Sequence, residues 1–220
     1  MEVVKYSGIG LRKQNQDFIL SQTIGENKYL FIVADGMGGY SAGDVAARVV
    51  AESINASLRH NISLHDSIKK ASEDLQTEIE TRGIDKTGCC LAALIVDQNS
   101  AKVFWIGDVR IYQFRNNEQI FITRDHTLIN EIEKYGPISF ERRKKYEHIV
   151  TRALMGSLND RVEEKELTAE KRDEFIICSD GIYKKLPVDA LLEMIRQNTL
   201  RLEELNNDFD DNHSFIYIKI

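Results

Sequence analysis

Hydrophobic positions along the chain fall into two kinds of run, and their spacing predicts the secondary structure. Unbroken apolar runs that stop at glycine or aspartate are typical of buried strands, whereas apolar residues four apart are typical of one face of a helix. Residues 28–36, with the sequence KYLFIVADG, are a run of the first kind. The second kind follows and predicts a helix over residues 42–58, with an apolar stripe formed by Ala46, Val50, Ile54 and Leu58.

A second helix is predicted directly after the first. Ser63 stands three residues before Asp66, the spacing of a helix cap, and apolar residues then recur at helical intervals until Gly83. We expect Gly83 to end this helix. The sequence therefore places two helices in succession after the first clear strand.

The middle and the end of the chain return to strand-like runs. Four of them are joined by turns rich in Asp, Asn and Ser that are short enough for hairpins. We therefore predict an antiparallel meander over residues 89–96, 101–107, 110–114 and 119–123. Residues 127–147 are polar and are expected to be helical or irregular. The remaining predicted elements are a strand at 174–181, a helix at 188–205 and a closing strand at 214–220.

The order of these elements favours a layered α+β fold. Strands come in runs and helices come in runs, which is typical of antiparallel sheets covered by helices and not of alternating βα units. The 220 residues are 42% hydrophobic and 29% charged, which is enough for one substantial core and short for two. Because there are two prolines and no low-complexity linker, we expect a single domain over residues 1–220.

Charge and cysteine content narrow the partners and the compartment. Thirty-five acidic and 29 basic side chains give a formal net charge of -6, so the surface should repel nucleic acid and anionic membranes. No run approaches the roughly 20 apolar residues of a membrane span, and the N-terminus lacks a hydrophobic signal region. Three cysteines without a CxxC pair fit neither a disulfide framework nor a zinc site. We expect a cytoplasmic protein.

Aspartates stand at the ends of the predicted strands. Asp35, Asp108 and Asp180 each follow an apolar run, and Asp211 comes just before the closing strand. If these strand ends converge, the carboxylates repel each other unless a cation neutralises them, and an all-oxygen set suits Mg²⁺ or Mn²⁺ better than zinc. Taken singly, each aspartate has a plainer explanation, since Asp is a common turn residue after a strand.

The loop that follows Asp35 has the glycine content of a phosphate-binding loop. Four glycines between positions 36 and 43 would let backbone amides close around an anion, but the Asp35 carboxylate would repel a phosphate unless positive charge stood between them. Arg12 and Asp17 admit two interpretations. They are either a phosphate-binding guanidinium beside a further acidic ligand, or a surface ion pair at a turn.

Eight segments occur in the order and approximate spacing of the metal-dependent protein phosphatases (PPM), the type 2C serine/threonine phosphatases. They are RKQNQD, VADGMGGYSAGDVAA, TGCC, WIGDVRIYQF, TRDHTL, VTRALMG, IICSDGI and DDNHSFIYI. Each segment is weak alone, but eight in sequence, from about residue 5 to residue 220, are specific. The chain therefore resembles the compact bacterial members of this family.

This resemblance implies a four-layer αββα sandwich of two antiparallel sheets flanked by helices, with a two-metal centre at one edge. The implied metal ligands are Asp17, Asp35, Gly36, Asp108, Asp180 and Asp211. Asp35 would bridge two Mn²⁺ or Mg²⁺ ions, the Gly36 carbonyl would bind one of them, and Asp108 matches the position of a third, more weakly held ion. Arg12 would bind the phosphate as a catalytic and substrate-binding residue.

The implied activity is hydrolysis of phosphoserine or phosphothreonine in proteins. A water that bridges the two ions would lose a proton easily and attack phosphorus in line, without a covalent phosphoenzyme. Phosphoproteins would be the substrates, a cognate serine/threonine kinase would be the opposing partner, and the phosphatase would be a monomer.

Several positions depart from the family pattern. Gln16 stands where many relatives have Glu, and Met37 stands where animal-type enzymes have a histidine proposed as general acid. Cys89 and Cys90 replace small hydroxyl residues and are expected to pack in the core. The segment between residues 186 and 208 is short. These departures keep an alternative open, a catalytically silent phosphatase-like binding or regulatory module, although the retained set of mutually repelling aspartates favours an active enzyme.

Other kinds of site lack their defining residues. Position 41 is serine where a dinucleotide-binding GxGxxG needs glycine, no GK[ST] ending is present, and no cysteine is followed six positions later by arginine. The segment that begins at Asp208 lacks the glycine and glutamate of a calcium-binding loop. The basic run from Arg142 to Lys145 lies in the family's variable flap. It is most simply a solvated helix face, though near an active site it could steer a phosphorylated substrate.

Overall fold

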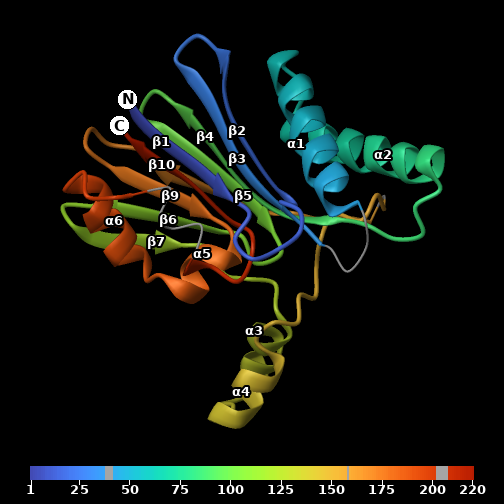
Figure 1. Cartoon of the computed structure of the whole chain (residues 1–220). Helices are drawn as coiled ribbons and strands as arrows, with labels where there is room; N and C mark the ends of the chain where they lie inside the picture. Colours follow the sequence, from blue (N-terminus) through green and yellow to red (C-terminus); the bar gives the residue numbers. More distant parts are fainter. Residues whose placement is uncertain (38–41, 158, 202–207) are drawn as a thin grey trace.

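The computed structural model describes residues 1–37, 42–157, 159–201 and 208–220. Over these residues the chain forms two five-stranded antiparallel sheets stacked face to face, with helices on the outer faces (Figure 1). The four-layer αββα arrangement expected from the sequence is therefore confirmed. No helix among these residues has the length and the apolar character that a membrane crossing requires.

The first sheet has the strand order β2-β3-β4-β5-β8. Its strands are β2 (Asp17–Gly25), β3 (Lys28–Gly36), β4 (Cys89–Asp97), β5 (Ser100–Ile106) and β8 (Glu163–Thr168). The second sheet has the order β1-β10-β9-β6-β7. Its strands are β1 (Glu2–Gly8), β10 (His213–Lys219), β9 (Glu174–Cys178), β6 (Arg110–Arg115) and β7 (Glu118–Ile122).

Each sheet buries both of its faces. Successive side chains of a strand point to opposite faces, so Phe31 and Val33 of β3 contribute to the core between the sheets, while Ile32 and Ala34 face the helices. Helices α1 (Gly43–Arg59) and α2 (Leu64–Arg82) cover the first sheet. Helices α5 (Asp180–Lys185) and α6 (Val188–Arg196) cover the second. The uninterrupted apolar runs seen in the sequence follow from this two-sided burial.

The first two helices begin and end near the predicted positions. The Ser63 hydroxyl accepts a hydrogen bond from the Asp66 backbone N–H at 3.1 Å, which satisfies a donor that the helix itself cannot satisfy. Gly83 ends α2 in the left-handed conformation, with φ of 64°. Local sequence signals are therefore sufficient to define these helices.

The predicted meander is wrong. β4 and β5 pair in the first sheet, whereas β6 and β7 pair in the second, so the chain crosses from one sheet to the other between Ile106 and Arg110. Gly107 makes the crossing possible with φ of 90°, and a Cβ there would lie 2.2 Å from the Cys90 sulfur. A turn dipeptide signals a change of direction but does not say whether the next strand returns to the same sheet.

Two further differences concern element ends and an edge strand. The helix predicted over 188–205 ends at Arg196, and Asn198 follows in the left-handed conformation with φ of 54°; residues 202–207 of that prediction lie outside the described residues. β8 was not predicted, because its sequence EEKELT lies almost wholly exposed at a sheet edge and carries no apolar run.

A helical segment projects from the end of the sandwich (Figure 1). We call residues 127–150 the projecting segment; it contains α3 (Leu128–Ile132), a 3-10 turn (Glu133–Tyr135) and α4 (Phe140–Tyr146). Its two ends are held together, since the Leu128 N–H donates to the Ile149 carbonyl at 2.8 Å. The helical or irregular structure expected here is confirmed.

Candidate active site

Asp17 and Asp35 face each other at one edge of the first sheet. Asp17 is the first residue of β2, Asp35 lies one residue before the end of β3, and the antiparallel register pairs them directly. Directly opposed residues share a face with Cβ atoms roughly 5 Å apart, and like charges in such a pair are destabilising. The register therefore brings two of the predicted ligands together and creates a repulsion that a cation or a proton must relieve.

Gly36 lies where the backbone is crowded. A Cβ at this position would lie 2.1 Å from the Gly43 carbonyl oxygen and 2.8 Å from that of Gln16, and the Gly36 N–H donates to Gln16 at 3.0 Å. A side chain could not fit without displacing the start of α1. Glycine therefore allows α1 to begin beside the end of β3. The loop glycines at 38 and 39 lie outside the described residues.

Two more aspartates come from the crossing and from the second sheet. Asp108 lies directly after β5 and Gly107, and Asp180 is the first residue of α5, which follows β9. Burial raises the pKa of Asp108 to about 6, and the charge of Asp180 is the next cause. The two carboxylates therefore interact although they come from different layers of the fold. The predicted convergence of strand ends is present.

Asp35 lies at the centre of this acidic cluster, which we define as Asp17, Asp35, Asp108, Asp180 and Asp211. Desolvation by the surrounding protein is the largest cause that raises the pKa of Asp35 well above its ordinary value, and the charges of the other four carboxylates raise it further. Asp35 therefore interacts with each of the other four acids of the cluster. A cation would lower the pKa of these groups and remove the repulsion between them.

Asp17 has one oxygen that is paired and one that is not. The Ser179 hydroxyl donates to Oδ2 at 2.8 Å, whereas Oδ1 is buried and has no hydrogen-bond partner among the described residues. Burial is the main cause that raises the pKa of this carboxyl to about 7. A buried acceptor without a donor costs about 1–3 kcal/mol, so Oδ1 is suited to an electropositive partner from outside the chain.

The two outer members of the cluster are paired with basic side chains. The Asp211 Oδ2 lies 2.7 Å from Nη2 of Arg12, and Asp180 is bonded to Lys184 one turn along α5. Across the described parts of the chain, no three Asp, Glu, His or Cys side chains are arranged as a finished metal site. A cation bound between the aspartates would compete with these two ion pairs.

The donor set of the cluster nevertheless fits a hard divalent cation. It consists of carboxylate and carbonyl oxygens, which Mg²⁺ and Mn²⁺ prefer, and it contains the unpaired Asp17 Oδ1 described above. Arg12 and Lys184 supply one positive charge each against five carboxylates, so the cluster keeps an excess of negative charge. The structure thus brings the predicted ligands near one another, and the two basic side chains do not balance the charge of the carboxylates. These ligands are Asp17, Asp35, Gly36, Asp108, Asp180 and Asp211.

Arg12 is carried by a loop that Asn212 holds in place. The Asn212 side chain donates to the carbonyls of Ile9 and Gln14 at 2.9 and 3.0 Å and accepts from the Gln16 N–H at 2.9 Å. Asn212 follows Asp211 directly, so one short stretch positions both an acidic ligand candidate and the arginine that faces it. This role of Asn212 was not apparent from the sequence.

His126 holds the turn that presents Asp108. Its Nδ1 accepts a hydrogen bond from the Gly107 backbone N–H at 3.0 Å, and the His126 backbone N–H donates to the Gly107 carbonyl at 2.8 Å. The ring proton therefore lies on Nε2, which donates to Glu163 at 3.0 Å. The imidazole is buried and stacked on Trp105, and we had given it no role from the sequence.

The family departures have simple structural positions. Cys89 and Cys90 are buried on the two faces of the first sheet, as expected, and burial raises the pKa of both thiols. The Met37 N–H donates to the Gly88 carbonyl at 2.9 Å. Lys184 was missed in the sequence because α5, which contains both Asp180 and Lys184, was not predicted. The spacing of four residues is typical of an ion pair on a helix.

The sequence of this chain is similar to those of known protein phosphatases. The family model "Protein phosphatase 2C" matches residues 7–211. The serine/threonine phosphatase stp of Listeria monocytogenes is 27% identical over 184 residues, which cover 78% of this chain and 73% of stp. The serine/threonine protein phosphatase PstP of Mycobacterium tuberculosis is 26% identical over 200 residues, which cover 84% of this chain and 37% of PstP.

A solved structure of similar architecture contains metal. The crystal structure of the catalytic domain of PstP in complex with two manganese ions superposes with a TM-score of 0.80 at 26% identity, covering 98% of this chain and 96% of that domain. The match therefore extends over nearly the whole chain, including both sheets and the end where the aspartates meet.

Proposed function

This chain belongs to the protein phosphatase 2C family, and from that premise we propose that it hydrolyses phosphoserine and phosphothreonine in proteins by direct attack of water on phosphorus. The observation that carries the proposal is the convergence of five aspartates from both sheets on one point of the molecule, with a buried Asp17 oxygen that no described group satisfies. The relatives that match are serine/threonine phosphatases by name.

The proposed metal ligands are the residues of the acidic cluster together with the Gly36 carbonyl. Two Mn²⁺ or Mg²⁺ ions held there would lower the pKa of a bound water and offset the charge of the phosphate oxygens. The two manganese ions in the PstP catalytic domain support this number. Asp108, which is presented from the crossing between the sheets, is proposed to hold a third ion.

The chain's own residues hold these ligands in place. Ser179 fixes one oxygen of Asp17, and the β2–β3 register fixes Asp17 against Asp35. Because Asp35 comes from the first sheet and Asp180 from the end of a strand in the second, both sheets are required for one centre. We therefore propose that residues 1–220 work as a single catalytic domain.

Arg12 is proposed to bind the phosphate. Its guanidinium is exposed, lies beside the acidic cluster and can present a fork of donors to phosphate oxygens. In this structure the fork is bonded to Asp211, so phosphate binding would exchange one anionic partner for another. Met37 has no proton to donate, so we propose that the leaving group takes its proton from water.

The proposal is tested by hydrolysis of p-nitrophenyl phosphate with Mn²⁺, with Mg²⁺, with chelator, and after the metal is restored. We expect chelator to remove activity and restored metal to recover it. Asp35→Asn tests the centre itself, and Asp97→Asn is the matched control, since Asp97 is a half-exposed aspartate at the opposite end of the same sheet. Absence of hydrolysis under every metal condition, from a folded protein, would establish the catalytically silent module instead.

A further inference from the structure

A cavity outside the acidic cluster lies at the base of the projecting segment. Its volume is about 350 Å³, and its lining includes Arg110 of β6, Arg124 and Asp125 after β7, Asn130 of α3, and Arg143 and Glu147 of α4 and its end. The cavity therefore lies between the second sheet and the projecting segment. Nothing in the proposed hydrolysis uses it.

The cavity is connected to the acidic cluster through one tyrosine. The Tyr183 hydroxyl donates to the Asp108 backbone carbonyl at 2.8 Å, and the Arg110 guanidinium carbon lies 3.5 Å from the centre of the Tyr183 ring. Arg110 lines the cavity on the other side of this contact. Asp108 of the acidic cluster and Arg110 of the cavity are also two residues apart in the chain, so the two sites are close neighbours.

The three arginines of the cavity differ in how their donors are used. Arg110 donates to Asp125 through Nε and Nη2, at 2.7–3.1 Å, and Arg143 is paired with Glu133. Arg124 donates from Nη2 to the Asn130 carbonyl at 3.0 Å and has no carboxylate within ion-pair distance among the described residues. Among these three arginines, Arg124 is the one that forms no ion pair with a described residue, although its charge helps to lower the pKa of Glu131. A guanidinium has five N–H donors, so Arg124 keeps donors for a ligand.

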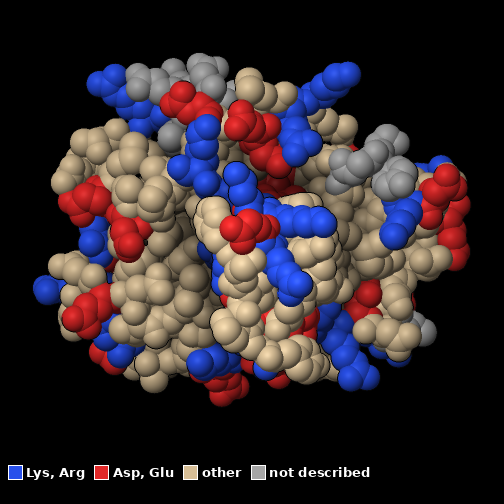
Figure 2. Space-filling view, turned by 90° about the horizontal axis from the view of Figure 1, so that it is seen from below, with Lys and Arg blue, Asp and Glu red and all other residues tan. Residues whose placement is uncertain are grey.

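The surface around the cavity is basic although the whole chain carries a net charge of -6. The run from Arg142 to Lys145 lies on α4 beside the cavity, and Figure 2 shows Lys and Arg side chains gathered at the centre of this end of the molecule, with acidic side chains among them. Glu147 and Asp125 also line the cavity, and Asp125 is neutralised by Arg110. Arg143 is likewise offset by Glu133, so the excess positive charge comes from Arg124 and from the other basic residues of the run. Glu131 and Glu147 oppose this charge near Arg124.

We propose that this cavity is a substrate subsite that binds an anionic side chain close to the phosphoresidue being hydrolysed, with Arg124 as the residue that binds it. The ligand chemistry is a carboxylate or a second phosphate, because both match the planar donor fork of a guanidinium. The inference rests on the proposed phosphatase function and adds a substrate class, phosphoprotein segments rich in acidic residues.

The test uses three phosphothreonine peptides that differ at the second and third residues on either side of the phosphothreonine. These positions carry glutamate, glutamine or phosphoserine. For the wild-type protein with Mn²⁺, we expect kcat/KM for the glutamate peptide to exceed that for the glutamine peptide about fivefold, and the advantage to shrink at high salt. Preference for the phosphoserine peptide alone would assign the subsite to a second phosphate, and preference for both would assign it to anions in general.

The deciding variant is Arg124→Gln. In this variant, kcat/KM for the glutamate peptide should be close to kcat/KM for the glutamine peptide, so their ratio should be close to one. Arg124→Lys keeps the charge and should retain part of the ratio, and Arg59→Gln, an exposed arginine at the far end of α1, is the matched control. A wild-type ratio near one, or a ratio that survives in Arg124→Gln, would overturn the subsite.

Two further measurements separate this inference from the proposed function. Hydrolysis of p-nitrophenyl phosphate, which is too small to reach the cavity, reports the metal centre alone. Binding of the same peptides to Asp35→Asn by fluorescence anisotropy reports the subsite without turnover, and equal affinity for all three peptides would reject the subsite even if hydrolysis is confirmed. If the wild-type protein hydrolyses none of the substrates but the anionic peptides still bind more tightly than the glutamine peptide, the proposed function is rejected and the anion site is kept.

Discussion

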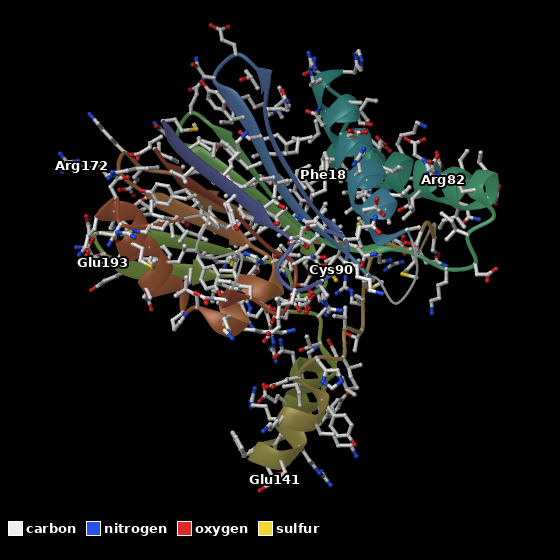
Figure 3. All side chains as sticks on the ribbon, in the orientation of Figure 1. Phe18, Arg82, Cys90, Glu141, Arg172 and Glu193 are labelled. Atoms are coloured by element: carbon white, nitrogen blue, oxygen red, sulfur yellow. The ribbon has the colours of Figure 1, made fainter. Side chains whose placement is uncertain are left out.

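The acidic cluster and the projecting segment lie at the same end of the molecule and are built in opposite ways (Figure 3). Cys90, which pairs with Asp35 across two central strands, lies at that end of the sandwich, whereas Glu141 lies at the far tip of the segment. Asp35, at the centre of the cluster, is placed by β3, a nine-residue strand that is buried on both faces along most of its length. The segment consists of helical pieces of five, three and seven residues.

The two regions differ in how far the core of the sandwich supports them. The cluster holds like charges in a desolvated place, which the sandwich core can support. The projecting segment buries little, and Tyr135 and Phe140 are 92% and 76% exposed. The proposed metal ligands are therefore held by the core, whereas the basic run from Arg142 to Lys145 lies on a segment that contributes little to the core.

Asp35→Asn should have the largest effect, with opposite signs on activity and stability. We expect kcat with saturating Mn²⁺ to fall by at least about 100-fold, because the substitution removes the carboxylate proposed to bridge the two ions. In chelator, the free energy of unfolding should rise by about 1 kcal/mol, because one of five mutually repelling groups is removed. Urea titrations and steady-state kinetics measure the two effects. Wild-type turnover, or a less stable variant in chelator, would contradict the central position of Asp35.

Arg12→Ala should raise KM for a phosphopeptide about tenfold and change kcat much less, if Arg12 binds the phosphate of the substrate as proposed. Lys13→Ala, which removes the neighbouring exposed cation, is the control. Equal KM values for the two variants would show that Arg12 contributes only general positive charge.

His126→Asn should change the pH dependence of stability. In the folded protein, burial lowers the pKa of His126 below its ordinary 6.5, and the ring lies beside Glu163 and Arg152. Once the chain unfolds, these surroundings are lost and the pKa returns to its ordinary value. As the pH falls below about 6.5, the unfolded state gains a proton that the folded state does not bind, so stability is lost toward acid. Asparagine keeps an acceptor for Gly107 but does not titrate.

Urea unfolding of His126→Asn at pH 7 and pH 5 should therefore show a smaller loss of stability than the wild type, by up to about 1 kcal/mol. His60→Asn, at the exposed end of α1, is the control. An unchanged difference between the two pH values would mean that His126 is not buried as a neutral base.

Lys184→Gln should raise the affinity for Mn²⁺ about threefold, since the ammonium competes for the Asp180 carboxylate. Electron paramagnetic resonance of free Mn²⁺ measures this without turnover. Lys185→Gln, in the same helix but bonded outside the acidic cluster to Asp210, should leave the affinity close to that of the wild type. A weaker affinity in Lys184→Gln would show that the lysine supports the ligands instead of competing for them.

Phe140→Ala should have the smallest effect, below about 0.5 kcal/mol in the free energy of unfolding, because the ring is exposed. Phe175→Ala, in the fully buried core between the sheets, should cost about 3–5 kcal/mol. Thermal or urea unfolding compares the two. A large loss from Phe140→Ala would show that the projecting segment supports the sandwich, contrary to the contrast drawn above.

Local signals in the sequence predicted the local parts of this fold. The apolar period of α1 and the cap residues Ser63 and Gly83 of α2 are properties of neighbouring residues, so they could be found without the structure. The sheet crossing at Gly107 and the polar edge strand β8 could not, because both depend on which distant strand lies alongside. Strand existence was therefore easier to predict than strand partnership.

The same distinction applies to the site. The strand-end aspartates carry a positional signal, and the family motifs add to it, so their convergence could be predicted. Arg124 and His126 lie in the family segment TRDHTL, but the sequence does not show their contacts with the backbone of Asn130 and Gly107. The assignment of each aspartate as a ligand stays a prediction that metal-binding measurements on single variants will test.

The position of Asp35 and Asp180 on different sheets has a thermodynamic consequence. Any ion that binds both carboxylates joins the two layers of the sandwich, and it does so only in the folded chain. Folding and occupancy are then linked by mass action, at about 2.7 kcal/mol for an ion present at 100 times its dissociation constant. The melting temperature of the protein should therefore rise with the concentration of free divalent ion, and it would report that concentration in the absence of any substrate.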